Sequence, residues 1–375
     1  MSEGLPGRAF EEVAMNLWPE RRIQDLLGIE VPIIQAPMAG FAMSEMVIAV
    51  SEAGGLGSLP CALLSADQLR SELGMIRRRT SRPININFFC HRPPEVDLKR
   101  ELLWRERLAS YYVELGLDSK APVPSSSRTA FDSAMCDLVV EFKPEVVSFH
   151  FGLPDKKLVS RVKPAGAKIL SSATTVDEAR WLENEGCDAI IAQGCEAGGH
   201  RGMFLTQDLS TQVGTIALVP QVVDAVTVPV IAAGGIADAR GIVAAFALGA
   251  SAVQLGTAYL FCAEAKVGSL HRSALRNAND RRTVLTNVFT GRPARAIINR
   301  VVREVGPMSD LAPEFPLAAG ALAPLRTNSE AVGSDDFVPM WSGQAARMGR
   351  ELPAGELTRR LAADVLKKLK ALSLS

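Results

Sequence analysis

The sequence predicts an α/β protein, a (β/α)8 barrel with a helical and loop insertion after the eighth strand. Short β-branched runs alternate with amphipathic segments from residue 31 to residue 260, which is typical of a parallel sheet whose strands are joined by helices. The strongest glycine signals lie at or after the sixth, seventh and eighth strands. An open, doubly wound sheet usually places its phosphate-binding glycines after the first strand, so this late placement favours a closed barrel.

Eight short apolar runs are the expected strands. They span residues 31–36, 55–59, 83–89, 146–151, 168–173, 189–193, 229–233 and 252–259. Between them lie segments with apolar residues at helical spacing, several followed by the glycine that commonly ends a helix. The clearest expected helices span residues 44–53, 66–79, 176–185 and 239–248.

Two segments interrupt this pattern. Residues 91–142 are too long for one crossover, so we expect two helical pieces and a loop that help to cover the site. From residue 265 to 339 the strand pattern disappears and Pro, Gly and Ala become frequent, before a helical finish over residues 342–372. The predicted parts are an N-terminal arm (1–24), the barrel core (25–264), an insertion covering the site (265–340) and C-terminal helices that close the barrel (341–375).

The composition indicates a globular protein with a small ligand. Lys plus Arg equals Asp plus Glu at 41 each, so the charge pattern of nucleic-acid or anionic-membrane binding is missing, and the 47% hydrophobic content allows a large core. The six cysteines show no metal-ligand spacing, which favours reduced thiols over a metal site. The acidic first residues lack a secretory signal, so we expect a cytoplasmic protein.

One uncharged stretch, residues 241–263, is long enough to be tested as a membrane span. It contains Gly249 at a helix stop and the polar residues Ser251, Gln254 and Thr257. This pattern favours a helix, a turn and a strand, and we expect no membrane contact.

Three glycine-rich sites carry the expected chemistry. Residues 193–202 (QGCEAGGHRG) follow the sixth strand and combine glycines with His200. Residues 234–235 (GG) follow the seventh strand, and residues 254–257 (QLGT) lie on the eighth. In barrels these last two places commonly form a phosphate site from backbone N–H groups. Either could alone serve a tight turn, but together on adjacent strands they favour a phosphate-bearing cofactor.

Two other strand ends are candidate contacts for the same ligand. Residues 35–40 (QAPMAG) end the first strand with small residues and a rigid proline, a backbone that could pass flat beside an aromatic ring system, although a plain turn competes. Asn87, near the end of an apolar strand, needs hydrogen-bond partners from loop backbone or from a ligand's polar edge, and we favour the ligand.

Four histidines compete for the role of general base. Imidazole has an ordinary pKa of about 6.5 and can accept a proton near pH 7. The adjoining glycines favour His200 over His91, which follows the third strand. His150 shares a strand face with Ser148 and is either a substrate contact or a satisfied structural residue. His271 begins a polar helical stretch and is expected on the surface.

Three other side chains have competing explanations. Glu196 is expected to be solvated or bonded to nearby backbone, rather than to act as an acid catalyst. Arg201 either attracts an anionic substrate or is a solvated arginine. Ser342 opens the final expected helix and could simply cap it.

At these residues the chain resembles the FMN-dependent nitronate monooxygenases, formerly grouped as 2-nitropropane dioxygenases. The matching elements are QAPMAG (35–40), GGLGS (54–58), NINFFCHRP (85–93), VSFHFGLP (147–154), AQGCEAGGHRG (192–202), AAGGI (232–236) and QLGT (254–257). The glycine-histidine element is shared with flavin-dependent enoyl-acyl-carrier-protein reductases of the same barrel type. FCHRP and SFHFG point more narrowly to the class I nitronate monooxygenases.

The resemblance implies oxidation of an alkyl nitronate, such as propionate 3-nitronate, by O2 to a carbonyl product and nitrite through a flavin semiquinone. It also implies that His200 is the base for neutral nitroalkanes. The implied FMN contacts are Ala36, Pro37, Met38, Asn87, Gln193, Gly198, Gly199, Gly234, Gly235, Gln254, Leu255, Gly256 and Thr257. The implied substrate contacts are His150, Ser342 and Gln344, the last two from a segment similar to the family's AGQ element. A homodimer is allowed for, and no metal or nucleic acid is expected.

The substrate and two alternative functions stay open. Residues 307–324 contain only Phe315 as an aromatic, where relatives are expected to line the pocket with more, and residues 290–295 (TGRPAR) look family-like without an assigned role. A flavin reductase that oxidises NAD(P)H and reduces an enoyl thioester or a quinone would use the same barrel and turn. A non-catalytic flavin or phosphate sensor is the other alternative, although an intact His200 argues against it.

Overall fold

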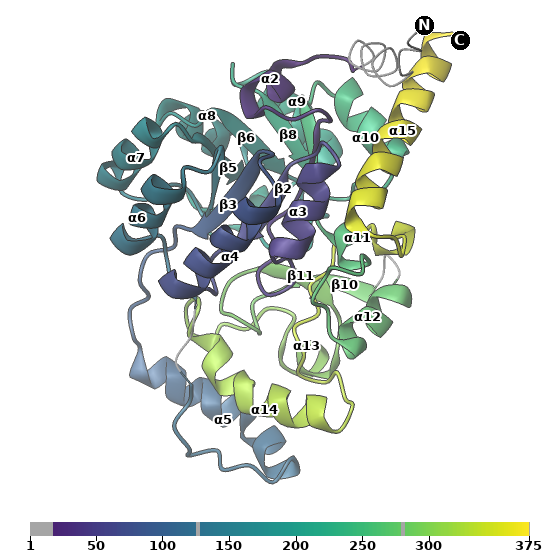
Figure 1. Ribbon diagram of the computed structural model, residues 1–375. Coiled ribbons are helices and arrows are strands. Elements are labelled where there is room, and N and C mark those ends of the chain that lie inside the picture. The colour runs from purple at the N-terminus through teal and green to yellow at the C-terminus, as the bar shows by residue number, and fades with distance from the viewer. Residues whose placement is uncertain (1–17, 125–127, 279–281, 375) are drawn as a thin grey trace, which may run out of the picture.

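The computed structural model describes residues 18–124, 128–278 and 282–374, so most of the expected N-terminal arm, residues 1–17, lies outside the described part. Eight parallel strands form one sheet, in the order β1 (Ile33–Gln35), β9 (Ala252–Leu255), β8 (Val230–Ala233), β6 (Ala189–Gln193), β5 (Lys168–Ala173), β4 (Val146–His150), β3 (Ile84–Phe89) and β2 (Gly57–Pro60). A parallel bridge between Ile34 and Leu56 joins the two ends of this order. The predicted (β/α)8 barrel is thus confirmed (Figure 1).

The observed strands agree closely with the expected ones except the last. β9 ends at Leu255, and the chain turns at Gly256 into the short helix α11 (Thr257–Leu260) instead of continuing as a strand to residue 259. Gly256 has φ −104° and ψ −78°, which is incompatible with an extended strand. Thr257 therefore begins a helix, and the expectation that it lies on the eighth strand is wrong.

Helices join the strands around the outside of the barrel (Figure 1). They are α3 (Ser44–Glu52), α4 (Ala66–Arg79), α6 (Ser133–Phe142), α7 (Lys156–Val162), α8 (Val176–Asn184), α9 (Thr215–Val223), α10 (Ala239–Ala247) and α15 (Ala354–Ser373). The four clearest expected helices are confirmed, and the uncharged stretch 241–263 is divided among α10, β9 and α11. Within the described ranges, no helix is long and apolar enough to cross a membrane.

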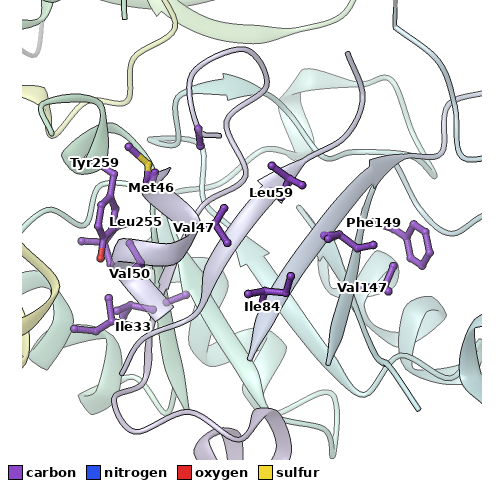
Figure 2. Close-up of a cluster of buried hydrophobic side chains, with 14 of the residues drawn as sticks. Ile33, Met46, Val47, Val50, Leu59, Ile84, Val147, Phe149, Leu255 and Tyr259 are labelled. Carbon is purple, nitrogen blue, oxygen red and sulfur yellow. The ribbon is translucent and has the colours of Figure 1, made fainter. Parts of the chain in front are cut away.

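The main core lies between the outer face of the barrel and these helices. Figure 2 shows part of it, in which Met46, Val47 and Val50 of α3 lie near strand residues such as Ile33 and Leu59. Alternate strand residues face the helices, so each strand contributes apolar side chains to this layer. Their burial is the main stabilising contribution to the barrel.

The short helix α2 (Arg22–Leu27) contributes to the interior of the barrel. Ile23 and Leu27 belong to one buried cluster with residues at the starts of strands, among them Val146 and Ala189. Since the cluster holds the strand starts, α2 packs at the end of the barrel opposite the strand carboxyl ends. The expected boundary between arm and barrel, after residue 24, falls inside this helix.

Two insertions, residues 91–132 and 265–341 as far as they are described, form a second body of structure that we call the cap. In it α5 (Leu98–Glu114) lies beside α14 (Ala318–Ala331), and Trp104 donates a hydrogen bond from its ring N–H to the carbonyl of Ala318 at 3.2 Å (Figure 1). A separate buried cluster joins α5 and α14 with α13 (Arg300–Val305). The cap therefore has its own core, and it also carries α12 (Ser269–Arg276).

The second insertion contains two strands that the sequence analysis missed. β10 (Thr283–Thr286) and β11 (Ala294–Ile297) pair antiparallel, and β11 also pairs with β7 (Gly199–His200). The equally short barrel strands were recognised by their regular alternation with helices, and β10 and β11 lie outside that alternation. The final helix also begins later than expected, at Ala354 rather than residue 342, because Pro353 disfavours helical geometry in the residue before it.

Candidate active site

A cavity at the carboxyl ends of the barrel strands encloses about 1270 Å³ of space out to its mouth. Barrel enzymes place their functional residues at this end, because the loops after the strands converge there. The expected site residues that line it are Ala36, Pro37, Met38, Asn87, His150, Gln193, Gly198, Gly199, His200, Gly234, Gly235, Gln254, Gly256 and Thr257. The structure thus brings together the three glycine sites, His150 and His200.

Three expected site residues do not line this cavity. Leu255 belongs to the main core outside the barrel, because successive strand residues face opposite sides. Ser342 is fully buried, and its hydroxyl donates to the carbonyl of the next residue at 3.0 Å. The backbone N–H of Gln344 donates to the carbonyl of Glu196 at 3.0 Å. The segment with Ser342 and Gln344 therefore supports the turn after β6 through its backbone.

Backbone N–H groups without acceptors gather where β8 and β9 end. The amides of Gly234, Gly235, Gly256 and Thr257 make no hydrogen bond within the described residues, and all four residues line the cavity. N–H groups in protein interiors normally have a partner. This cluster is suited to a ligand with several acceptor oxygens, such as a phosphate.

The glycines of the cavity wall serve two different purposes. Gly234 has φ +116° and Gly235 has φ +68°, and a Cβ on Gly234 would lie 2.9 Å from the hydroxyl oxygen of Thr215. The backbone itself therefore requires glycine at these positions. A Cβ on Gly198 would instead overlap the backbone of residues 342–343. Gly198 allows the C-terminal segment to pack against the turn.

Gln254 and Asn87 present unused acceptors. The Oε1 atom of Gln254 is buried and has no hydrogen-bond partner within the described residues. Buried polar atoms rarely stay unpaired, so this atom is a candidate contact for a ligand N–H. Asn87 donates from Nδ2 to the hydroxyl of Ser148 at 2.9 Å and to its carbonyl at 3.2 Å. Only the amide oxygen of Asn87 is left for a ligand.

The turn after β6 is held by Gln193 and Arg201. Gln193 lines the cavity, but its Nε2 donates to the carbonyl of His200 at 3.0 Å and its Oε1 accepts from the amide of Gly202 at 2.8 Å. Arg201 is fully buried and donates to the carbonyls of Gln193 and Gly194 at 2.6 and 2.7 Å. Arg201 is therefore a structural clamp, and the expectation of a substrate contact or a solvated arginine is wrong.

Glu196 connects the turn to the start of α9. Its carboxylate accepts from the backbone N–H of Thr215 at 2.9 Å and from the hydroxyl of Thr215 at 2.8 Å. The same hydroxyl lies 2.9 Å from the carbonyl oxygen of Gly234, so Thr215 links the first two glycine sites. Bonding to nearby backbone, the explanation favoured for Glu196, is confirmed.

His200 lies on β7, and the cap fixes its position. It pairs with Ala294 of β11, and its Nε2 lies 2.9 Å from the hydroxyl oxygen of Thr290. That hydroxyl also donates to the carbonyl of Arg292 at 3.4 Å. With its hydrogen so directed, the hydroxyl accepts from Nε2–H and leaves the lone pair on Nδ1. Nδ1 makes no hydrogen bond within the described residues.

His150 braces the strand that carries His200. Its Nε2 lies 3.2 Å from the carbonyl oxygen of His200, which can only accept, and its Nδ1 lies 3.1 Å from the hydroxyl of Ser172. The carbonyl contact requires a hydrogen on Nε2, and burial lowers the pKa of His150 to about 3, so the ring is neutral near pH 7. His150 lines the cavity as a satisfied histidine whose nitrogens are both in use.

The electrostatic surroundings of His200 disfavour its protonated form. Burial lowers the pKa of His200 well below 6.5, and the positive charges of Arg128 and Arg292 lower that pKa further. The resting imidazole is therefore neutral and able to accept a proton. An anionic group bound beside the ring would raise this pKa, because it would stabilise the imidazolium.

Aromatic rings surround His200. Its ring centroid lies 5.2 Å from that of Phe315, 5.3 Å from Trp341, and 6.1 Å from both Phe89 and Phe151. Phe315, the only aromatic of residues 307–324, thus reaches the site. Apolar rings at this spacing limit the water around the imidazole and strengthen charge interactions there.

His271 is not the surface residue that the sequence suggested. Only 3% of it is exposed, and its Nε2 lies 3.0 Å from the carbonyl oxygen of Trp341. Burial lowers the pKa of His271 to about 4. The side chain of its neighbour Arg272 also turns inward, to the carbonyls of Phe261 and Ala265, and only the packing shows which side of α12 faces inward.

Three residues of the site have no role in the sequence analysis. Arg128 and Trp341 line the cavity, and Thr290 contacts the ring of His200. Thr290 lies in the family-like element 290–295, which was a usable signal. Arg128 lies in the segment 91–142 that was expected to help to cover the site, but it belongs to no motif, so the residue itself was not singled out.

The six cysteines are free thiols, as expected. Burial raises the pKa of Cys61 and Cys187, so both are protonated and inert near neutral pH. In the part of the chain that the structure describes, no group of three or more His, Cys, Asp or Glu side chains could hold a metal ion.

Comparisons with known proteins agree with this geometry. The family model of nitronate monooxygenase matches residues 20–364. The chain is 40% identical to the nitronate monooxygenase of Pseudomonas aeruginosa, over 92% of this chain and 99% of that one, and 42% identical to that of Paraburkholderia phytofirmans, over 94% and 97%. The nitroalkane oxidase structure from Streptomyces ansochromogenes matches with a TM-score of 0.85 at 39% identity, over 94% of this chain and 99% of that one. The chain belongs to the nitronate monooxygenase family and is therefore an oxidoreductase with a flavin cofactor.

Proposed function

We propose that the protein uses FMN and O2 to oxidise alkyl nitronates to a carbonyl compound and nitrite. The observation that carries the proposal is one cavity that is lined both by a neutral His200 and by backbone N–H groups without acceptors. The relatives named nitronate monooxygenase support this reaction. The similar structure named nitroalkane oxidase supports a second substrate form, the neutral nitroalkane.

The residues of the cavity fit FMN. The unpaired amides of Gly234, Gly235, Gly256 and Thr257 would hold its phosphate, and this single cradle suits a mononucleotide. The buried Oε1 of Gln254 would accept from an N–H of the flavin ring system. Bound FMN would supply the electron transfer from the nitronate and the reaction with O2, while the protein supplies binding and proton handling.

His200 would remove the α-proton from a neutral nitroalkane. The proton moves to Nδ1, while Nε2–H keeps its hydrogen bond to Thr290. The resulting nitronate is an anion beside a new imidazolium, and this pairing offsets the cost of charging a buried ring. The surrounding aromatic rings limit water, which strengthens the attraction. A substrate supplied as the nitronate needs no such step.

Substitution of the base tests this assignment. We expect His200→Asn to keep FMN but to lose about 10²- to 10⁴-fold in turnover of nitroethane, the usual contribution of a general base, and much less with ethyl nitronate. Initial rates with both substrates at equal flavin content measure the difference. His271→Gln, a change at a buried histidine that does not line the cavity, is the matched control. Equal losses with both substrates would exclude proton abstraction by His200.

The electron donor separates this proposal from the alternatives. Anaerobic reduction of the bound flavin is followed by absorbance after adding propionate 3-nitronate or NADPH. Reduction by the nitronate alone supports the monooxygenase. Reduction by NADPH alone would select the reductase of enoyl thioesters or quinones, and no reduction by either would select a sensor.

A further inference from the structure

Arg292 belongs to the same cap segment as Thr290 and has no part in the proposed function. Its guanidinium carbon lies 3.9 Å from the centre of the Phe151 ring, and one of its Nη atoms donates to the carbonyl of Met203. The backbone carbonyl of Arg292 accepts the hydroxyl of Thr290 at 3.4 Å. Phe151 and Thr290 both contact the ring of His200. Arg292 therefore reaches His200 through two neighbours, although it is not among the described residues that line the active-site cavity.

Phe151 has a backbone conformation that requires support. Its φ is +72°, a region that bulky side chains rarely adopt, and only 4% of the residue is exposed. Its ring centroid lies 4.5 Å from that of His150 and 5.5 Å from that of Phe315. A strained residue keeps its place only when its surroundings hold it. The stacked guanidinium of Arg292 is one of these constraints, so it helps to fix the aromatic wall beside His200.

The positive charge of Arg292 is not neutralised by a contacting carboxylate. Within the described ranges no acidic side chain forms an ion pair with it, and its buried Nε has no hydrogen-bond partner. Burial lowers the pKa of Arg292 to about 10, while the charge of Glu178 acts in the opposite direction. The carboxylate of Glu178 is itself held by the backbone N–H groups of Phe204 and Leu205, at 2.6 and 3.2 Å. The guanidinium is therefore a cation near pH 7.

Few other charges act on the His200 imidazole. Burial has the largest effect on the pKa of His200, and the further groups that lower it are Arg128, His150, Arg292 and His91. Burial lowers the pKa of His150 to about 3 and that of His91 to about 4, so both rings are neutral near pH 7. The hydroxyl and the aromatic rings that contact the imidazole carry no charge. Among the described residues, Arg128 and Arg292 are thus the cations that disfavour the imidazolium.

We propose that Arg292 is a positioning residue for the proposed base, which acts on His200 through Phe151 and does not touch the substrate. The inference rests on the proposed function, because only there does His200 have a proton to accept. The stack limits the movement of Phe151, and the cation keeps the resting imidazole unprotonated. Arg292 thereby extends proton abstraction to more acidic pH. A substrate supplied as the nitronate uses neither effect.

The dependence of rate on pH tests this role. Arg292→Met keeps an unbranched apolar side chain and loses the guanidinium. For nitroethane, the acid-side fall of kcat/KM should move to higher pH, because the imidazolium loses an opposing cation. Above that fall kcat should be lower by about 2- to 10-fold, the equivalent of one cation–π contact, with a much smaller change for ethyl nitronate. Arg292→Lys keeps a cation that can lie over the ring, and should restore the pH profile.

Arg70→Met is the matched control. Arg70 also lies over a phenylalanine, 5.9 Å from the centre of the Phe142 ring, but it belongs to α4 and is not among the described residues of the cavity wall. Its loss should leave the pH profile unchanged. Thermal midpoints identify a folding defect, and Arg292→Gln replaces the methionine variant if one is found. An unchanged profile in the Arg292 variant, equal losses with nitroethane and ethyl nitronate, or the same shift in Arg70→Met would overturn the inference.

NMR of the histidine rings separates this inference from the proposed function. The chain contains four histidines, and the signal that is missing from His200→Asn identifies His200. As pH is lowered without substrate, this signal should begin to shift at a higher pH in Arg292→Met than in the wild type or in Arg70→Met. Such a difference in a protein that oxidises neither nitroethane nor ethyl nitronate would keep the inference and remove the proposed function. The same onset in all three proteins would overturn the inference.

Discussion

The barrel wall and the cap wall of the cavity differ in chemistry. The described residues of the barrel wall are glycines, apolar residues and neutral polar side chains, with no Asp, Glu, Lys or Arg among them. The cap wall contributes the cation of Arg128 and the indole of Trp341. The barrel wall offers backbone N–H groups that any phosphate can use, whereas the cap wall offers side chains that can distinguish one small molecule from another.

This difference assigns separate tasks to the two walls. The unpaired amides of the barrel wall suit a phosphate, so we expect this wall to hold the cofactor. The cap has its own core and is built from two insertions, so it can change without disturbing the barrel. His200 lies where the walls meet, since β7 follows a barrel strand and pairs with a cap strand.

The largest effect is expected from weakening the core of the cap. Trp104→Ala should lower the free energy of unfolding by about 3–5 kcal/mol, because it removes a buried indole and its hydrogen bond to Ala318. Urea denaturation followed by circular dichroism measures the loss. Leu102→Ala, at a residue of the same helix that is 57% exposed, should change little. Loss of FMN in Trp104→Ala to the same extent as loss of substrate binding would contradict separate tasks for the two walls.

A change in the barrel wall should act on the cofactor instead. Gly234→Ala should weaken FMN binding about 10- to 100-fold, because alanine is strained at φ +116° and its Cβ would crowd Thr215. Fluorescence titration of the apoprotein with FMN gives the dissociation constant. Gly166→Ala carries a similar strain, at φ +95°, with open space around the Cβ and away from the cavity, so it should retain FMN. Normal FMN affinity in Gly234→Ala would exclude this glycine pair from the phosphate site.

A smaller effect is expected where the two walls meet. Thr290→Val removes the hydroxyl that holds Nε2 of His200, so kcat/KM for a neutral nitroalkane should fall about 10-fold. The apparent pKa in the pH–rate profile should also fall, because the imidazolium loses an acceptor. Thr290→Ser should restore both values. A uniform loss without a pH shift, or a failure of serine to rescue, would show that Thr290 does not position His200.

The smallest effect concerns stability at low pH. The folded-state pKa of His271 is about 4, below the unfolded value of about 6.5, so the unfolded chain binds more protons between these values. Its contribution is therefore fully present above pH 6.5 and is lost as pH falls toward 4. His271→Gln can still donate to the carbonyl of Trp341, and should reduce the loss of stability between pH 7 and 5 by about 1–2 kcal/mol. Urea midpoints of both proteins at pH 7 and pH 5 measure this loss of stability. The same pH dependence in both proteins would contradict the lowered pKa of His271.

Much of the barrel could be predicted because its signals are local. Each strand is a short apolar run, and each glycine site follows a strand, so residues 193–202 and 254–257 identify one end of the barrel from sequence order alone. The cap could not be predicted in this way. β10 and β11 lie outside the alternation of strands and helices, and the pairing of β11 with β7 joins segments that are far apart in the chain.

The sequence by itself determined the barrel, the glycine-rich cradle and the presence of a histidine beside it. Only the tertiary structure decided what that histidine can do, because its neutral ring depends on Thr290, Arg128 and Phe315, which come from distant parts of the cap. It also decided that Arg201 is a clamp and His271 a buried residue. Backbone geometry is specified by neighbouring residues, whereas burial and charge at one atom are sums over everything packed around it.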